Sequence, residues 1–307
     1  MTNAQAASQP KPPTAGRCET LGIGVRRVLA PNPSPMTLHG TNSYIVGTGD
    51  VALIDPGPNI AAHGAALMQA LDKGERISHI LVTHSHVDHS PLARPMAEAL
   101  GVPIYAFGPS SAGRSPQMQD LAAKGLIAGG EGIDASFSPD ITLADGEPLA
   151  HGDWALTALH TPGHLSNHLC FAVNDVLFSG DHVMGWASSL VSPPDGDMAA
   201  YMASTRRLAA LDWSVIHAGH GAPITDPAAR LAFLIHHREH REAAILAELA
   251  KGEATIPALT ETLYTDTPSA LLPAAQRNVL AHLLDLVQRG LVAANPAPGP
   301  QSHFRLR

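Results

Sequence analysis

Thr83-His84-Ser85-His86-Val87-Asp88-His89 is the stretch of this sequence that decides the fold. It places three imidazoles and one carboxylate within six residues, and these are the side chains that bind zinc and similar metals. His84 and His86 are two residues apart, so in an extended or turning segment they can converge on one ion. Asp88 and His89 lie just beyond, in position for a second ion. Because two adjacent metals with a shared water make a hydrolytic site, the run predicts an enzyme.

The residues that precede the run are mostly apolar and rich in β-branched side chains. They predict a buried strand over 79–83, so that the histidines follow its C-terminal end, where α/β folds place their chemistry. The alternative is a polar loop with incidental histidines, since the chain contains 18 of them. A chance cluster need not follow a buried strand or carry an interposed aspartate, so we favour the metal site.

The composition of the whole chain limits the classes of function. Its 307 residues suffice for one large domain and a small one. The net charge is −8, with no block of lysine and arginine, which disfavours a broad nucleic-acid-binding surface because phosphate contacts need cations. A local basic groove stays open as an option.

The cysteines and the N-terminus indicate where the protein resides. Cys18 and Cys170 are the two cysteines, too few for a disulfide framework, and such a count suits a reduced cytoplasm. The N-terminal segment lacks the apolar core of a secretory signal, and no apolar run approaches membrane-spanning length. We therefore expect a cytoplasmic protein without a membrane partner, and a disordered tail over residues 1–18.

The patterns predict alternating strands and helices through the first two thirds of the chain. Strands are expected over 21–29, 43–47, 51–54, 79–83, 102–106, 155–159, 169–173, 176–179 and 214–218, and helices over 60–73 and 91–100. Residues 108–135 are rich in glycine, serine and proline, which predicts a long irregular insert of the kind that shapes substrate pockets.

The composition changes at Thr225, where a second unit begins. Asp226-Pro227 is an N-cap followed by a proline at the first helical position, and helical spacing continues to Gly252. Shorter helical patterns over 256–264 and 270–289 precede a hairpin pattern over 290–306. Helix, helix and hairpin outline a winged-helix module. We expect a tail over 1–18, a larger domain over 19–225 and a mainly helical, winged-helix-like domain over 226–307.

Three further strand ends hold residues of the metal-binding type. His164 follows the strand predicted over 155–159, Asp181 follows the one over 176–179, and His220 follows the one over 214–218. A glycine stands next to each of them, and a glycine lets the backbone approach a metal centre without a Cβ clash. Four strand ends can therefore converge on one edge of a sheet sandwich.

Together with Leu53-Ile54-Asp55-Pro56-Gly57, these residues resemble the motifs of the metallo-β-lactamase superfamily, all present and in order over roughly residues 20–225. The resemblance implies an α/β fold, an αββα metallo-β-lactamase sandwich with a dinuclear site at one edge. It implies metal ligands in two sets joined by a bridging aspartate, namely His84, His86 and His164 for the first metal, Asp88, His89 and His220 for the second, and Asp181 for both.

The resemblance also implies supporting roles and a cofactor. Asp55 would orient a ligand from beneath the site, and Asp88 could also accept a proton from the nucleophile as a catalytic group. His168 and His182 are candidates for the layer behind the ligands, or else ordinary strand-end residues. Two zinc ions are the expected cofactors, with manganese or iron as competitors in such a nitrogen and oxygen site.

A closer resemblance is to the subgroup of the β-lactamase-like endoribonuclease, which carries a C-terminal winged-helix-like domain. It rests on Gly40-Thr41-Asn42-Ser43-Tyr44, on Gly180 to Gly185, on His237-Arg238 and on Ala281-His282-Leu283. Members of this subgroup include RNA-cleaving enzymes and thioesterases of polyketide pathways. Lactam-cleaving members usually have cysteine at the position of Asp181, so antibiotic hydrolysis is disfavoured.

Three hypotheses of function follow. The leading one is a dinuclear metal-dependent hydrolase of a small-molecule ester or thioester, with a metal-bridging hydroxide as nucleophile. The alternative is a metal-dependent endoribonuclease on single-stranded RNA, against which the acidic net charge counts. The non-enzymatic alternative is a winged-helix regulator with a metal-sensing domain, which a full set of ligands disfavours. A homodimer is left open.

Overall fold

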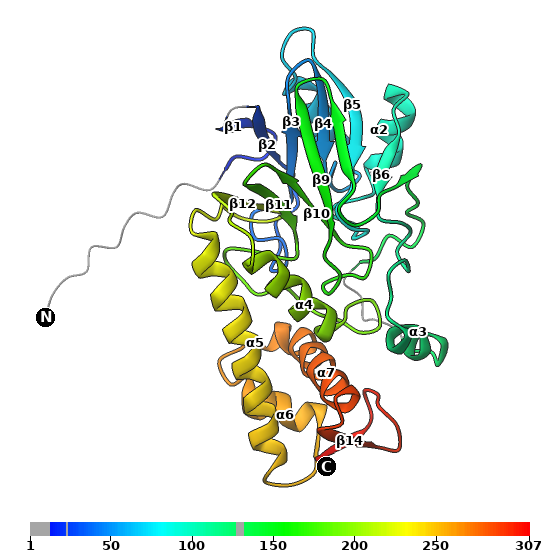
Figure 1. The fold of residues 1–307 in the computed structure, drawn as a ribbon, viewed down its shortest axis with the longest axis vertical. Helices are drawn as coiled ribbons and strands as arrows, with labels where there is room; N and C mark the ends of the chain where they lie inside the picture. Colours follow the sequence, from blue (N-terminus) through cyan, green and yellow to red (C-terminus); the bar gives the residue numbers. More distant parts are fainter. Residues whose placement is uncertain (1–12, 23, 127–131) are drawn as a thin grey trace, which may run out of the picture.

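Two β-sheets form the core of the larger part of the molecule, which lies in the upper half of Figure 1. The computed structural model describes residues 13–22, 24–126 and 132–307. The first sheet contains, in spatial order, β1 (Cys18–Gly22), β2 (Val25–Leu29), β3 (Asn42–Val46), β4 (Asp50–Ile54), β5 (Arg76–Leu81), β6 (Ile104–Ala106) and β7 (Ile141–Thr142). The second contains β12 (Val215–Ala218), β11 (Val176–Gly180), β10 (Leu169–Val173), β9 (Trp154–His160) and β8 (Pro148–His151).

Helices cover these sheets and build the C-terminal part. They are α1 (Ala61–Gln69), α2 (Ala93–Leu100), α3 (Pro116–Ala123), α4 (Met198–Ala209), α5 (Pro227–Leu249), α6 (Ile256–Leu263), α7 (Leu272–Gln288) and a 3₁₀ turn, η1 (Ser269–Leu271). A third sheet of three strands, in the order β13 (Ala254–Thr255), β15 (His303–Leu306) and β14 (Val292–Asn295), completes the C-terminal part.

The two large sheets pack face to face over an apolar core. Ile54 and Leu81 of the first sheet and Phe171 and Phe178 of the second lie in this core, each at most 1% exposed. The outer face of the first sheet is apolar as well, and α1 and α2 cover it. A sheet that is apolar on both faces must be buried on both, so the sequence pattern of these strands dictates an inner layer.

The outer face of the second sheet is covered by α4 and the first half of α5. Leu208 of α4 and Leu234 of α5 pack against Ile216 of β12. Each helix begins at an aspartate whose carboxylate accepts a backbone N–H of the first turn, Asp197 from Ala200 and Asp226 from Ala229. The layers are therefore helix, sheet, sheet and helix, and the predicted αββα sandwich is confirmed.

The strand directions bring several loops to one edge of the sandwich. β4 and β5 run parallel, and so do β11 and β12, so each pair ends at the same edge. β9 ends beside the start of β10, where His160 pairs with Leu169. Backbone bonds join the two sheets here, from Leu169 N to Thr83 O (2.7 Å) and from Asn42 N to Gly219 O (2.7 Å). We call this the site edge.

The C-terminal part has the winged-helix outline that the sequence predicted. Leu259 of α6, Leu283 of α7 and Phe304 of β15 share its apolar core. Figure 1 shows α5 running from the sandwich to this end of the molecule. Leu234 of α5 packs on the second sheet and Ile245 packs in the C-terminal core, so one helix belongs to both units. The expected domain limits at residues 18 and 225 stay predictions.

The prediction of one strand over 21–29 was wrong. The chain forms two antiparallel strands instead, β1 and β2, with Gly22 paired to Val25. Gly24 has a φ of +69° and supplies the left-handed backbone that such a tight reversal needs. Cys18, which was expected in the disordered tail, is the first residue of β1 and pairs with Val28. Residues 1–12 of the expected tail lie outside the described residues.

Two helices were missed and one was predicted too long. The insert over 108–135 contains α3, whose N-cap Ser115 accepts a hydrogen bond from Met118 N, and Asp197 caps the unpredicted α4. Both helices begin after a residue that commonly caps helices, so the sequence did contain a signal for each start, but it consisted of one residue. The helix expected over 60–73 ends at Gln69, before the turn at Gly74. Residues 127–131 of the insert lie outside the described residues.

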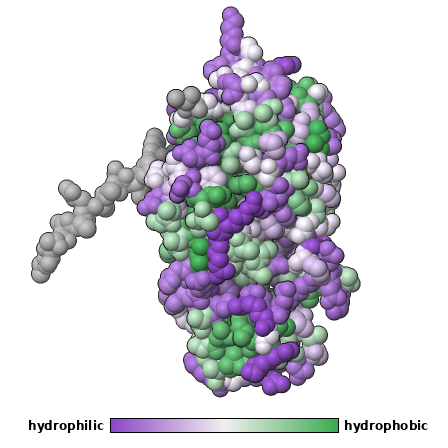
Figure 2. Space-filling view, viewed as in Figure 1, coloured by the Kyte–Doolittle hydropathy of each residue, from purple (hydrophilic) through white to green (hydrophobic). Residues whose placement is uncertain are grey.

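Within the described ranges, no helix combines the length and the apolar character that crossing a membrane requires. Figure 2 shows hydrophilic residues spread between hydrophobic ones on the visible face, with a hydrophobic area at the end built by the C-terminal elements.

Arg238 of α5 ties the two units together, and its removal should destabilise the protein. It is 2% exposed, donates to Ser189 O and to Asn278 Oδ1 of α7 (3.2 Å), and its guanidinium lies 5.3 Å from the centre of the Tyr201 ring. We expect Arg238→Ala to lower the free energy of unfolding by about 2–4 kcal/mol, because buried acceptors lose their donor.

Urea unfolding followed by circular dichroism would measure this loss. Arg206→Ala is the matched control, because Arg206 of α4 makes an exposed ion pair with Glu239, the residue after Arg238 on α5, and its loss should change stability by less than about 1 kcal/mol. Equal losses in the two variants would contradict a special role for Arg238.

Candidate metal centre

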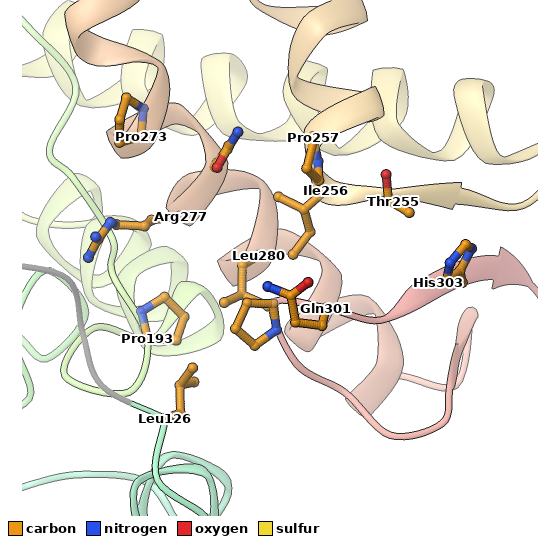
Figure 3. A pocket seen from close by; sticks show the side chains of 12 residues that line it. Leu126, Pro193, Thr255, Ile256, Pro257, Pro273, Arg277, Leu280, Gln301 and His303 are labelled. Atoms are coloured by element: carbon orange, nitrogen blue, oxygen red, sulfur yellow. The ribbon is translucent and has the colours of Figure 1, made fainter.

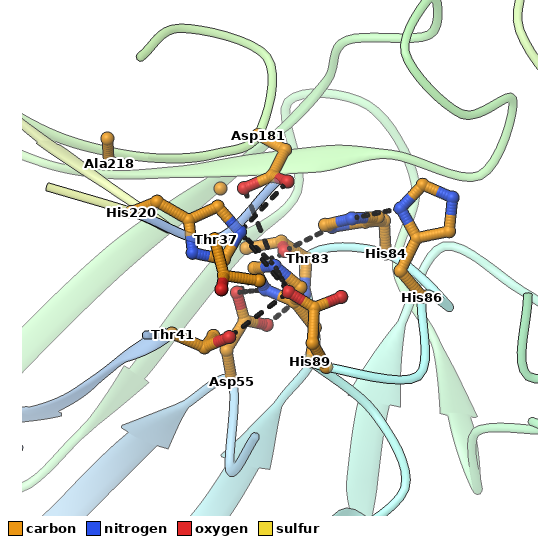
Figure 4. Close-up of polar contacts among 12 residues, drawn as sticks. Thr37, Thr41, Asp55, Thr83, His84, His86, His89, Asp181, Ala218 and His220 are labelled. Carbon is orange, nitrogen blue, oxygen red and sulfur yellow. Dashed lines mark hydrogen bonds and ion pairs between the residues drawn. The ribbon is translucent and has the colours of Figure 1, made fainter. Parts of the chain in front are cut away.

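Seven side chains of the metal-binding type meet at the site edge. Figure 4 shows His84, His86, His89, Asp181 and His220 among them. The seven side chains form two groups, within each of which the candidate ligand atoms lie within 4.8 Å of one another: His84, His86, His164 and Asp181 in the first, and Asp88, His89 and His220 in the second. All seven come from loops that follow β5, β9, β11 and β12. The fold therefore brings together every residue for which the sequence predicted metal binding.

The first group presents three imidazole nitrogens to one point. His86 Nδ1 lies 3.0 Å from His84 Nε2 and 3.1 Å from His164 Nε2. Nitrogens bound tetrahedrally to one zinc, with bonds of about 2.0–2.1 Å, lie about 3.3 Å apart. Burial lowers the pKa of His86 to about 3 and also lowers the pKa of His84 and His164, so these rings are neutral and offer lone pairs.

The second group has the same spacing. His89 Nε2 lies 3.3 Å from Asp88 Oδ2 and 3.4 Å from His220 Nε2, and His220 Nε2 lies 3.2 Å from Asp88 Oδ2. Burial acts to lower the pKa of His220, but Asp181 and Asp88 outweigh it and raise that pKa to about 10. The carboxylates thus favour positive charge among the atoms of the second group. Either protons or a metal cation can supply that charge.

Asp181 lies between the two groups and contacts both. Its Oδ2 is 3.2 Å from His220 Nε2 and 3.8 Å from His164 Nε2, and its Oδ1 is 3.4 Å from His89 Nε2. Oδ1 is buried and accepts no hydrogen bond from the described residues. A buried carboxylate oxygen without a donor needs a cation or a proton. The residues present therefore fit a pair of cations that share Asp181.

Asp55 holds the histidine loop from beneath. Its Oδ2 accepts from His89 Nδ1 (2.8 Å) and from Thr83 Oγ1 (2.7 Å), and its Oδ1 accepts from Thr83 N (2.7 Å). His84 Nδ1 in turn lies 2.9 Å from Thr83 Oγ1. One buried carboxylate thus fixes the orientation of two imidazoles and leaves their Nε2 atoms directed at the centre. Asp55 is not itself in either group.

Backbone carbonyls orient two more of the rings. His164 Nδ1 donates to Leu190 O (2.6 Å), and His220 Nδ1 donates to Gly40 O (3.0 Å). Each bond fixes the tautomer that leaves Nε2 free to bind a metal. Sequence reasoning could not find these partners, because a carbonyl carries no residue-specific signal.

Thr41 supports Asp88 and was not predicted to belong to the site. Its hydroxyl donates to Asp88 Oδ2 (3.1 Å) and accepts from Asn32 Nδ2 (2.9 Å). The motif Gly40-Thr41-Asn42 was noted in the sequence without a role. Its position directly before a strand that pairs with the Asp55 strand was the available signal.

His168 and His182 lie at different depths behind the candidate metal ligands. The His168 ring is 5.0 Å from the His84 ring, and its Nδ1 lies 2.9 Å from Thr161 Oγ1. The His182 ring lies one layer further away, 5.8 Å from His168 and 4.7 Å from Tyr201 of α4. His168 therefore packs directly behind the candidate ligand His84, whereas His182 joins the loop that carries Asp181 to α4.

Gly219 is required by the close approach of the backbone. A Cβ at this position would collide with Asp181 Oδ1 and would come within 2.7 Å of His89 Cε1. No side chain fits between those two donors, so the expectation that glycine permits a close approach is confirmed at this position.

The insert closes one side of the site. Val87 N donates to Gly132 O (2.7 Å), and Asp134 N donates to Ser85 O (2.8 Å). Ser90 Oγ donates to Asp134 Oδ2 (3.1 Å). The part of the insert that the structure describes is therefore bound along the histidine run, which agrees with its predicted role in shaping the pocket.

Asp88 faces the opening of the site. Its side chain is 21% exposed, whereas the side chain of Asp181 is 10% exposed and that of His220 is 1% exposed. A small hollow beside His86 and His164 is lined further by Ile133, Leu165, Leu190, Ser192 and Asp195. Its described lining holds no lysine or arginine, and Asp195 in that lining pairs with Arg114.

A larger hollow of about 420 Å³ lies in the C-terminal part, between α7, the start of α6 and the segment around Pro193 (Figure 3). Arg277, Gln301 and His303 give it polar walls. None of the seven candidate ligands lines it. It is therefore separate from the metal centre.

Comparison with known proteins agrees with this geometry. Residues 36–220 match the family model described as metallo-beta-lactamase superfamily, and residues 255–298 match the beta-lactamase associated winged helix domain. The lactamase-like protein adaB of Aspergillus niger is 32% identical, over 87% of this chain and 80% of its own.

Two further matches extend over nearly the whole chain. The beta-lactamase-like protein 2 homolog of Drosophila melanogaster is 32% identical, over 88% of this chain and 90% of its own. A crystal structure of a metallo-beta-lactamase family protein from Thermus thermophilus is 27% identical and superimposes with a TM-score of 0.73, over 94% of this chain and all of that one.

Asp55→Asn should weaken metal binding without removing a ligand. Asparagine keeps the shape but loses the charge that holds His89 and Thr83, and loss of such a supporting carboxylate lowers metal affinity by roughly 10- to 100-fold. Competition with a coloured chelator would measure the affinity for zinc. Asp50→Asn is the control, because Asp50 begins β4, the strand that Asp55 follows, and its carboxylate pairs with Arg76 and His151 away from the site. Unchanged affinity in Asp55→Asn would contradict this role.

Proposed function

This chain belongs to the metallo-β-lactamase superfamily and is a metallo-hydrolase of that fold, and we propose that it hydrolyses small esters or thioesters with two bound metal ions. The single observation that carries the proposal is Asp181, which lies between two groups of donors whose atoms are spaced as metal ligands are. A pair of sites joined by one carboxylate supports a two-metal hydrolase rather than a single structural metal.

The donor set supports the assignment of ligands. His84, His86 and His164 would hold one metal, Asp88, His89 and His220 the other, and Asp181 both. Imidazole and carboxylate donors make zinc the first choice, with manganese or iron as alternatives. When bound, the two ions would lower the pKa of a shared water and so supply hydroxide at neutral pH.

The chain's own residues orient the imidazoles and can move a proton during the reaction. Asp55, Leu190 O and Gly40 O hold the imidazoles in the required tautomers. Asp88 is the most exposed carboxylate of the set, and Thr41 fixes its Oδ2. Asp88 therefore stands where its carboxylate can accept the proton of the attacking water and pass it to the leaving alcohol or thiol.

The charge around the centre supports a small neutral substrate over RNA. A single-stranded RNA would bring a phosphate at each nucleotide and would need lysine or arginine along its path. The hollow beside His86 and His164 is lined by Asp195, and the nearby Arg114 is already paired with that carboxylate, which offsets its charge. The net charge of −8 acts in the same direction.

Hydrolysis of acyl thioesters by the purified protein tests this function. We expect turnover of acetyl and butyryl thioesters of N-acetylcysteamine, loss of turnover on chelation, and its recovery on addition of zinc. Asp88→Asn should lower kcat/KM by roughly 100-fold or more, because both a ligand and a proton acceptor are lost. Asp120→Asn is the control, since Asp120 lies on α3, is exposed and pairs with Lys124 of the same helical stretch.

Two outcomes would contradict the proposal. One is cleavage of single-stranded RNA that depends on His84 and Asp88, with no thioester turnover by the zinc-loaded protein. The other is retention of a specific DNA sequence without any hydrolysis, as a winged-helix regulator would show.

A further inference from the structure

A groove without charged side chains lies between the sandwich and the C-terminal domain. It has a volume of about 200 Å³, and we call it the uncharged groove. Its apolar walls come from Met36, Met184, Trp186, Leu190, Leu271 and Ala274. None of its described lining residues is aspartate, glutamate, lysine, arginine or histidine. Among the large hydrophobic side chains that stay exposed, Met36 (44%) and Trp186 (39%) both lie in this groove.

The uncharged groove adjoins the metal centre. Leu190 lines both this groove and the small hollow at His86 and His164, and its carbonyl accepts from His164 Nδ1 (2.6 Å). A Cβ on Gly221, the residue after His220, would come within 3.0 Å of the Trp186 ring. One wall of the groove therefore contacts a histidine loop from each group of donors.

Hydrogen bonds fix the floor of the groove in place. Arg230 of α5 donates to Met184 O (2.7 Å) and Ala187 O (2.6 Å), and Val191 N donates to Asn278 Oδ1 (3.1 Å). Ser189 Oγ donates to His182 O (3.0 Å), next to Asp181 in the chain. These bonds hold the groove and the bridging carboxylate in one arrangement, so the groove is preformed.

We infer that the uncharged groove binds the apolar acyl arm of the substrate whose carbonyl carbon is attacked at the metal centre. This inference rests on the proposed ester or thioester hydrolysis and adds the substrate class, a medium-length apolar acyl group. Water attacks that carbon, the C–S or C–O bond breaks, and the products are the carboxylate and the free thiol or alcohol. The acyl arm lies in the groove throughout.

The hollow shown in Figure 3 lies on the other side of α7 and differs from the uncharged groove in its lining. Ala274 and Ala275 of this helix line the uncharged groove, whereas Gln276 and Arg277 line that polar hollow. That hollow has apolar walls as well, but an alkyl arm in it would lie beside Arg277 and would cost this charged group part of its hydration. In the uncharged groove the arm leaves water for apolar walls without displacing water from a charge. The apolar side of α7 is therefore the favoured position for the arm.

Chain-length dependence of the reaction tests the inference. We expect kcat/KM for thioesters of N-acetylcysteamine to rise about fourfold for each added methylene from acetyl toward octanoyl, until the groove is full. In Ala274→Lys, a cation enters the groove, and the ratio of octanoyl to acetyl kcat/KM should fall by roughly tenfold or more.

Gln276→Lys is the matched control, because it adds the same charge to the same helix on the side of the polar hollow. Its octanoyl to acetyl ratio should equal that of the unchanged protein. Trp186→Ala supplies a second variant that removes a wall of the groove without adding a charge, and it should also lower the ratio. Thermal unfolding of all three variants checks that they are folded.

A binding measurement separates this inference from the proposed function. Calorimetry on the metal-free protein compares the non-hydrolysable S-octyl and S-ethyl thioethers of N-acetylcysteamine. Tighter binding of the S-octyl probe, lost in Ala274→Lys and kept in Gln276→Lys, supports the inference even if no thioester is cleaved.

Acetyl and octanoyl thioesters cleaved with equal kcat/KM would overturn the inference and leave the proposed function standing. Equal binding of the two thioethers would overturn it as well. Cleavage of single-stranded RNA, with stronger RNA binding by Ala274→Lys and no binding of S-octyl probe, would overturn both.

Discussion

The charge balance at the site edge is the constraint on which the rest of the structure depends. Two carboxylates, Asp88 and Asp181, and five imidazoles meet at the ends of buried strands. Asp181 Oδ1 has no hydrogen-bond donor among the described residues, and His220 has a pKa raised to about 10 by its acidic neighbours. Buried carboxylates at this density call for compensating positive charge, and cations shared through Asp181 meet that demand with the donor spacing observed. The surrounding fold keeps the donors in this arrangement.

The contacts that support the candidate ligands extend from the first sheet to α5 and into the C-terminal part. Asp55 at the end of β4 orients His89, and the Leu190 carbonyl orients His164. The segment that carries Leu190 is bound in turn by Arg238 of α5 and Asn278 of α7. The C-terminal helices are thus part of the scaffold of the site and form one wall of the groove beside it. One helix, α5, packs in both units and links them.

Much of the site was readable from the sequence because its residues are local and chemically distinctive. The run from His84 to His89 follows a buried strand, and His164, Asp181 and His220 follow others, each beside a glycine. The errors have equally local causes. The reversal at Gly24 was hidden in a largely apolar run. The helix α3 is short and lies in a segment rich in glycine, serine and proline, and α4, although it has 12 residues, is marked only by its cap residue Asp197. Thr41 and the carbonyls of Gly40 and Leu190 escaped because their role depends on neighbours far away in the chain.

The sequence by itself determined the winged-helix outline and the identity of the seven candidate ligands, because helical periodicity and ligand chemistry are properties of short segments. Its resemblance to the metallo-β-lactamase superfamily implied the αββα layers. The resemblance also implied how those ligands divide around Asp181, whereas only the tertiary structure decided which groups orient them and where an apolar groove opens beside them. Met36, Trp186 and Ala274 are about 90 to 240 residues apart by their numbers, and no local pattern relates them. They line the same groove only because the sandwich packs against α7 and so brings these three residues together.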